Sequence, residues 1–150
     1  NFDFYEPRTV HESSLSPCVH SILAAKLNDE ARAYEFYLRT ARLDLDDYNN
    51  DTEDGLHITS MAGTWMSVVE GFAGMRVRES KLQFNPFLPG KWKSFSFTIG
   101  FRSATLKVNI TENGINIKNH NDVTLEIGIR NQIYTLAGNA EIEVNNAELV

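Results

Sequence analysis

Apolar residues recur at three- and four-residue spacing in the first half of the chain, and this spacing predicts three helices, over about residues 16–27, 28–45 and 58–72. The first begins at Ser16-Pro17, a hydroxyl followed by proline at the first helical position. The first two helices are expected to form a hairpin with a short connection. Residues 1–12 are predicted to be an extended lead-in, because Pro7 disfavours helix at the residue before it.

The third predicted helix is unusually apolar, since Glu70 is its only charged residue. Its apolar positions form one stripe: Met61, Ala62, Trp65, Val68, Val69 and Phe72. A helix with so little polar surface is usually buried on more than one side. Two other helices cannot surround it, so we expect this half to belong to a larger helical body than the chain contains.

From residue 75 onward the period changes from helical to alternating, which predicts β-strands. The clearest strand alternates Phe95, Phe97, Ile99 and Phe101 with small polar residues and glycine. A tight hairpin is predicted at Asn113-Gly114. Seven or eight short strands at this spacing favour an antiparallel β-sandwich. The expected fold class is α then β, with a helical part over 1–74 and a sandwich over 75–150.

Charge and composition narrow the classes of function. The chain has 150 residues and a formal net charge of −6, with −8 in residues 1–74 and +2 in residues 75–150. This balance argues against non-specific nucleic-acid binding. No apolar run approaches the ~20 residues of a membrane helix, so no membrane contact is expected. The single Cys18 permits no intrachain disulfide, which favours the cytoplasm, and it is predicted to be a buried packing residue.

The polar residues His57, Thr59 and Ser60 lie where the third helix begins. Backbone N–H groups lack intrahelical partners there, and together with two hydroxyls and an imidazole they suit a bound anion. In the alternative interpretation, Thr59 or Ser60 caps the helix and His57 is a packed turn residue.

The acidic segment 44–55 resembles a calcium-binding loop only superficially. Counting from Asp47, Thr52 occupies the glycine position and Ile58 the position of the final glutamate, so we expect a solvated or hydrogen-bonded loop. His120 is expected to be an exposed turn residue. Neither a Gly-rich phosphate loop nor a metal-spaced His/Cys cluster is present, and we expect no organic cofactor and no metal.

Three segments, over residues 4–17, 40–50 and 54–76, carry a family resemblance. They are Phe-Tyr-Glu-Pro-Arg-Thr-Val-His-Glu-Ser-Ser-Leu-Ser-Pro, Thr-Ala-Arg-Leu-Asp-Leu-Asp-Asp-Tyr-Asn-Asn, and the stretch from Asp-Gly-Leu-His-Ile-Thr-Ser to Glu-Gly-Phe-Ala-Gly-Met-Arg. They resemble the C-terminal part of the inverting disaccharide phosphorylases of glycoside hydrolase family 65. The resemblance is dense over residues 4–78 and weak beyond 80. It implies the last helices of an (α/α)6 barrel followed by a C-terminal β-sandwich.

The resemblance also implies a reaction, the phosphorolysis of an α-glucosyl disaccharide. Maltose is the expected substrate, with trehalose, kojibiose and nigerose as alternatives. Inversion needs a carboxylic acid to protonate the leaving oxygen while phosphate attacks the opposite face. The family carries that acid upstream of this region, so no catalytic residue is assigned here, and the 150 residues alone are expected to be inactive.

The resemblance implies a phosphate site in which His57 lies against the anion and Thr59 and Ser60 donate hydrogen bonds. Ser13 and Ser14 are expected to line the same pocket. His11 and Arg8 are weaker candidates, and the alternative is that they hold the lead-in, with Glu6 or Glu12 as partners. The implied partners are phosphate, the disaccharide, the remainder of the barrel and a second copy of the whole protein.

Two rival functions remain open. The parent protein could be a hydrolase-type member of the family. Alternatively, residues 75–150 could form a non-catalytic carbohydrate-binding or assembly module, with aromatics such as Trp92 stacking on sugar. We favour Trp92 as an anchor between the two halves.

Overall fold

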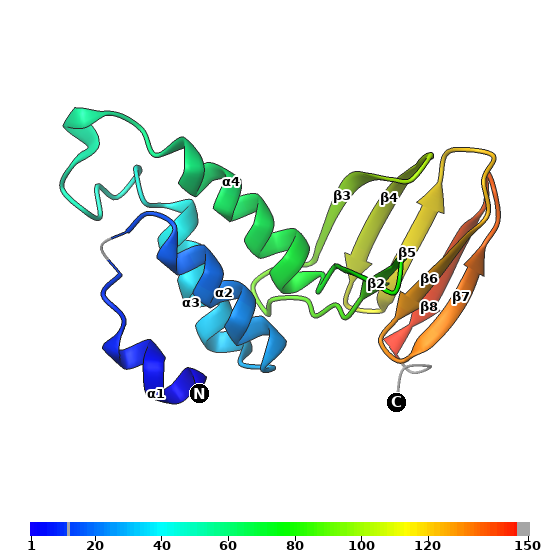
Figure 1. The fold of residues 1–150 in the computed structure, drawn as a ribbon, viewed down its shortest axis with the longest axis horizontal. Helices are drawn as coiled ribbons and strands as arrows, with labels where there is room; N and C mark the ends of the chain where they lie inside the picture. Colours follow the sequence, from blue (N-terminus) through cyan, green and yellow to red (C-terminus); the bar gives the residue numbers. More distant parts are fainter. Residues whose placement is uncertain (12, 147–150) are drawn as a thin grey trace. The chain divides into compact units, whose positions relative to one another are not determined.

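The computed structural model describes residues 1–11 and 13–146. They form two compact units, Asn1–Phe72 and Ala73–Val150 (Figure 1). The first unit is helical: α1 Phe2–Tyr5, a 3-10 turn Glu6–Arg8, α2 Ser16–Lys26, α3 Glu30–Ala41, a 3-10 turn Thr52–Asp54, α4 Ile58–Met66, and a π-helical turn Ser67–Phe72 that continues α4. The expected boundary at residues 74/75 lies two residues beyond the observed one.

The prediction of an extended lead-in is wrong, because residues 2–8 are helical. The carbonyl of Asn1 accepts the N–H groups of Phe4 and Tyr5, and Pro7 lies in the first turn of the 3-10 segment, where its missing N–H is not needed. The second helix is also shorter than predicted. It ends at Ala41, and Leu45, the last residue of the predicted range, is 79% exposed.

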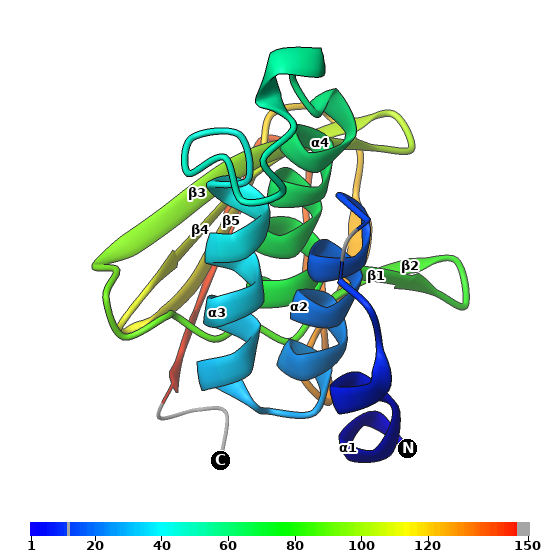
Figure 2. The same cartoon turned by 90° about the vertical axis from the view of Figure 1, so that its left-hand side faces the viewer.

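Helices α2, α3 and α4 pack side by side (Figures 1 and 2), and α4 contributes a face of small residues. Ser60, Gly63 and Ser67 are buried on this face. The predicted apolar stripe is only partly buried: Val69 and Phe72 are enclosed, whereas Met61 and Trp65 are about half exposed. The exposed part of the stripe, with Met61 and Trp65, therefore lies outside the contact that the small residues make.

Gly63 lies at a close contact between α4 and α2. A Cβ at this position would lie 2.8 Å from the Sγ of Cys18, which is buried as predicted. Burial raises the pKa of the Cys18 thiol, and its S–H donates to the carbonyl of Leu15. Cys18 is thus a packing residue, and its side chain occupies the space that the missing Cβ of Gly63 leaves.

A Gly63→Ala substitution is expected to destabilise the helical unit by about 1–3 kcal/mol, because the added methyl overpacks the contact with Cys18. This cost outweighs the higher helix propensity of alanine, about 1 kcal/mol. Gly100→Ala is the control, since a Cβ there meets nothing within 4 Å. The measurement is the free energy of unfolding by denaturant titration. Equal stability of the two variants would contradict the close contact.

The second unit is a two-sheet β-sandwich. Among the described residues its strands are β1 Arg76–Arg78, β2 Lys81–Phe84, β3 Ser94–Phe101, β4 Ala104–Thr111, β5 Gly114–Asn119, β6 Leu125–Ile129, β7 Gln132–Leu136 and β8 Glu141–Asn145. The sheets have the orders β1-β2-β6-β7 and β3-β4-β5-β8. Every pair is antiparallel except β2 with β6. The predicted fold class is confirmed, with one parallel pair that the sequence did not indicate.

The core of the sandwich is formed by the inward residues of both sheets, among them Leu82, Phe84, Leu106, Val108, Ile117, Ile127 and Ile129. Strand β3 shows the predicted half-buried alternation. The predicted hairpin joins β4 to β5, and Gly114 has a φ of 153°, in a position where a Cβ would lie 2.1 Å from the carbonyl oxygen of Val144. His120 is exposed, as predicted. In the described part of the chain, no helix combines the length and apolar character needed to cross a bilayer.

Candidate functional site

His57 lies at the N-terminal boundary of α4 and is held by a carboxylate thirteen residues upstream. The backbone N–H of His57 donates to Asp44 Oδ2 at 3.0 Å, and its ring Nδ1 lies 2.6 Å from Asp44 Oδ1. Nε2 faces Asp51 Oδ2 at a longer 3.4 Å. Asp44 therefore fixes both the backbone and the ring, while Asp51 makes a looser contact at the other nitrogen.

These carboxylates set the charge of the imidazole. The hydrogen bond to Asp44 raises the pKa of His57; burial of the ring opposes this effect, and the charge of Asp51 adds to it. The protonated form is therefore favoured, and in that form both ring nitrogens are donors. Nδ1 is committed to Asp44. Nε2 is the donor that an incoming anion could take over, because the Asp51 contact is long and partly exposed.

The acidic loop is hydrogen-bonded, as the sequence indicated. Asp47 Oδ1 accepts the N–H groups of Asp51 and Thr52 and the hydroxyl of Thr52. These bonds hold the pKa of Asp47 below its usual value. Asp44 and Asp51 contact different nitrogens of His57, so their oxygens and the ring do not converge on one point.

The other two residues of the predicted anion motif differ in exposure. Thr59 is exposed in the first turn of α4. Ser60 is 2% exposed, and its Oγ donates to the carbonyl of Thr40 at 2.9 Å. A hydroxyl has one proton to donate, so in this geometry Ser60 links α4 to α3. Neither residue caps the helix: His57 is at the N-cap position with no side-chain cap bond, and the capping alternative is wrong.

Ser13 and Ser14 precede α2. Ser13 is exposed and its Oγ accepts the N–H of Leu15, while Ser14 is partly buried. No hydrogen bond among the described residues joins this pair to His57. The structure thus joins His57 to Asp44 and Asp51 by direct contacts, to which the serine pair is not hydrogen-bonded.

The two weaker candidates hold the N-terminal segment. Arg8 donates to the carbonyl of Phe4 at 2.7 Å, and its guanidinium carbon lies 4.2 Å from the centre of the Phe4 ring. His11 Nε2 lies 3.6 Å from Glu6 Oε1. The alternative partner, Glu12, lies outside the described residues.

Asp44 is the partner of His57 that the sequence pattern did not identify. The chain has a dense run of acids just before the Gly-Leu-His motif, and that density was the available signal. It could not distinguish Asp44 from Asp46, which instead forms an ion pair with Arg42.

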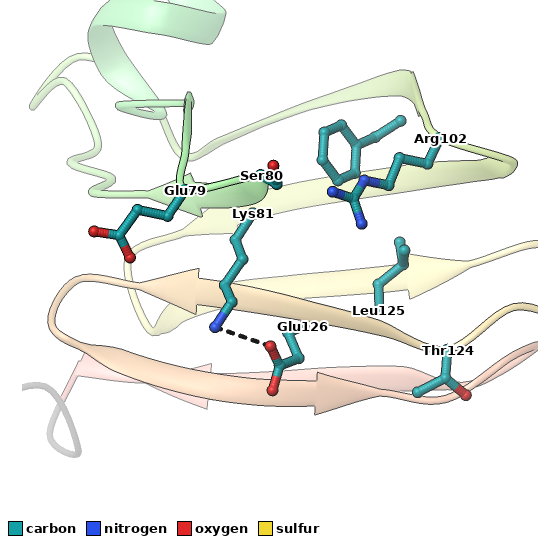
Figure 3. Close-up of a pocket in the computed structure, with 8 residues that line it drawn as sticks. Glu79, Ser80, Lys81, Arg102, Thr124, Leu125 and Glu126 are labelled. Atoms are coloured by element: carbon teal, nitrogen blue, oxygen red, sulfur yellow. Dashed lines mark ion pairs between the residues drawn. The ribbon is translucent and has the colours of Figure 1, made fainter.

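A separate pocket of about 280 Å³ lies in the β unit (Figure 3). It is lined by Glu79, Ser80, Lys81, Phe101, Arg102, Thr124, Leu125 and Glu126. Lys81 Nζ and Glu126 Oε2 form an ion pair of 2.9 Å across the parallel strands β2 and β6. Trp92 does not line this pocket; it is partly buried, with its ring edge-on to Phe95 at 5.6 Å.

Replacing Asp44 with asparagine is expected to lower the pKa of His57, because the main interaction favouring the imidazolium is lost. In the wild type this interaction contributes stability that is fully present below the unfolded pKa of about 6.5 and is lost as pH rises through the higher folded value. In the Asp44→Asn variant, the free energy of unfolding should no longer show this contribution to its pH dependence.

The measurement is an NMR titration of histidine-labelled protein, combined with denaturant unfolding at several pH values. Asp54→Asn is the matched control, because Asp54 is an exposed acid of the same loop. An unshifted His57 titration in Asp44→Asn would contradict the assignment.

Comparison with known proteins places these observations in a family. Residues 1–66 match "Glycosyl hydrolase family 65 central catalytic domain" and residues 75–136 match "Glycosyl hydrolase family 65, C-terminal domain". The two matches divide where the helical and β units divide. The chain belongs to glycoside hydrolase family 65.

Several relatives are named as disaccharide phosphorylases. The chain is 50% identical to the maltose phosphorylase of Bacillus subtilis (strain 168) over 146 residues, which are 97% of this chain and 19% of that protein. It is 40% identical to the alpha,alpha-trehalose phosphorylase of Geobacillus stearothermophilus, over 99% of this chain and 20% of the relative. The kojibiose phosphorylase of Escherichia coli (strain K12) is 34% identical, over 91% of this chain and 18% of the relative.

A solved structure from the human microbiome, named as a kojibiose phosphorylase, superimposes with a TM-score of 0.88 at 40% identity. The match covers 96% of this chain and 21% of that one. The chain therefore spans about a fifth of the length of the relatives it matches.

Proposed function

We propose that this chain is the C-terminal part of an inverting maltose phosphorylase, and that its helical unit supplies part of the phosphate site. The observation that carries the phosphate assignment is the His57 ring, which Asp44 fixes at the entry of α4 and whose pKa that hydrogen bond raises. A cationic ring and a helix N-terminus both attract an anion. The choice of maltose is supported by the 50% identity to the Bacillus subtilis enzyme, which exceeds that to the trehalose and kojibiose phosphorylases named above.

In this proposal phosphate is the nucleophile. It attacks the anomeric carbon from the face opposite the leaving glucose, and the products are β-glucose 1-phosphate and glucose. His57 Nε2 and the Thr59 hydroxyl donate to the phosphate oxygens, with Asp51 displaced from Nε2. Ser60 holds the start of α4 against α3. Ser13 and Ser14 are proposed to line the same pocket. The general acid lies outside this chain, and no cofactor or metal takes part in this chemistry.

The test is a phosphorolysis assay of the full-length protein with maltose, trehalose, kojibiose and nigerose, each with and without phosphate. The proposal expects turnover of maltose that requires phosphate and yields the β anomer of glucose 1-phosphate, identified by NMR. Release of free glucose without phosphate would identify a hydrolase instead. Preference for another disaccharide would change the substrate but keep the phosphate site.

The remainder of the barrel is the proposed partner of the helical unit. The exposed face of α4 carries Ile58, Met61 and Trp65, at 75%, 51% and 50% exposure, and such a face favours burial against further helices. The proposed setting is the cytoplasm, with a homodimer of the whole protein.

The 150-residue chain alone is expected to show no phosphorolysis, because it lacks the general acid and most of the sugar pocket. The measurement is product formation by the purified chain at high concentration, with the full-length protein as the positive control. Turnover by the chain alone would overturn the assignment of the acid to another segment.

A further inference from the structure

Three potential ligands of a metal ion converge where the N-terminal helical segment meets α2. One ligand atom each from Glu6, His11 and His20 lies within 4.8 Å of the other two. The His11 and His20 rings are edge-to-face with centroids 4.5 Å apart, and both pack against Phe36. The Glu6 and His11 side chains are 19% and 10% exposed. These residues lie five and nine positions apart in the chain, so no local spacing motif marks them.

Two ring nitrogens in this cluster have no hydrogen-bond partner. His11 Nε2 and His20 Nδ1 are both buried and unsatisfied. Leaving such groups unpaired inside a protein costs about 1–3 kcal/mol each, so an unmet polar atom needs an explanation. Because both nitrogens belong to one cluster with the Glu6 carboxylate, they point to one missing electrophilic partner rather than to two independent defects.

One tautomer of the His11 ring can act as a ligand. His11 Nδ1 lies 2.8 Å from Ser16 Oγ. When Nδ1 carries the proton and donates it to that hydroxyl, Nε2 presents its lone pair toward Glu6. Metal-bound histidines are commonly oriented by such a second hydrogen bond.

We propose that Glu6, His11 and His20 bind one divalent transition-metal ion of the zinc class. Two imidazoles and a carboxylate form a three-ligand set suited to Zn²⁺, with a fourth position for water. Tetrahedral bonds of about 2.0–2.1 Å need ligand atoms roughly 3.4 Å apart, so binding draws the three groups together by about 1 Å. The ion would link the N-terminal segment to α2. Ser13 and Ser14 lie in the stretch of chain between the ligands His11 and His20.

The structure also shows how a metal ion could reach the cluster and which positive charges lie near it. Glu6 and His20 line a cavity of about 350 Å³, which offers an entry path. Lys26 lines the same cavity, and Arg32 Nη1 lies 3.9 Å from Glu6 Oε2. These two cations lower the affinity for a divalent ion, but Arg32 also pairs with Asp3 and Asp29, which offset its charge.

The test is a metal titration of the full-length protein after removal of metals with a chelator. Zn²⁺ binding is followed by calorimetry, and Co²⁺ serves as a spectroscopic probe of histidine ligation. The wild type is expected to bind one equivalent that is absent from His20→Asn and Glu6→Gln, or weakened in them by about tenfold or more, since even outer-shell changes cost that much. Zn²⁺ should raise the unfolding temperature of the wild type but not of the variants.

His120→Asn is the matched control, because His120 is an exposed histidine of the β unit. Its binding should equal that of the wild type. Binding lost in His120→Asn but kept in His20→Asn means an adventitious ion only and overturns the proposal. So does the absence of saturable binding. Should His20→Asn fail to fold, Glu6→Gln decides, because it preserves the size of a partly exposed side chain; unchanged affinity in that variant rejects the site. This proposal does not depend on the phosphorylase assignment, which the phosphorolysis assay tests separately.

Discussion

A His57→Ala variant of the full-length protein is expected to raise the apparent KM for phosphate by about 10- to 100-fold, with the KM for disaccharide nearly unchanged. A hydrogen bond between charged partners contributes about 1.5–3 kcal/mol, and the hydrogen bond to Asp44 raises the pKa of this imidazole, which favours its protonated form. The measurement is initial rate as a function of phosphate at saturating disaccharide, and of disaccharide at saturating phosphate.

His120→Ala is the control for loss of a histidine outside the site, because His120 is exposed between β5 and β6. Its two KM values should match those of the wild type. Unchanged phosphate dependence in His57→Ala would reject the phosphate assignment. An equal rise in both KM values would indicate that His57 supports the fold of the pocket rather than the anion.

The largest effect on stability is expected in the sandwich. Ile127→Ala should lower the free energy of unfolding of the β unit by about 2–5 kcal/mol, because Ile127 is fully buried between the sheets and its removal leaves a cavity. The matched control is Ile133→Ala on the neighbouring strand β7, where the same side chain is 53% exposed. Denaturant unfolding measures both. Similar losses for the two variants would contradict the assignment of the core.

Alternation of apolar and polar residues and turn sequences predicted most of the β unit, because strands and tight turns depend mainly on neighbouring residues. Alternation located β3, and Asn113-Gly114 located the β4–β5 hairpin. The parallel pairing of β2 with β6 was not predictable in this way. It pairs Leu82 with Ile127, which are far apart in the sequence, and the sequence of neither strand identifies its partner.

The helical unit shows a different limit. Periodicity identified α4 but not which face packs on α2 and α3, since small residues make the close contact through Gly63 while Trp65 stays half exposed. Prediction of the site from the sequence had the same limit, because it did not identify which residues are in contact. The motif located His57, but its partner Asp44 is one of several acids in the loop, and only the fold selects it.

Asp44 and His57 close the acidic loop on itself, since one carboxylate binds the backbone and the ring at the far end. The position of His57 is then largely independent of the twelve residues between them. Closing a longer loop costs little, about 0.6 kcal/mol for each doubling of its length. Insertions and substitutions in this loop can therefore accumulate during evolution, and can alter the contact at Nε2, without displacing the imidazole from the start of α4.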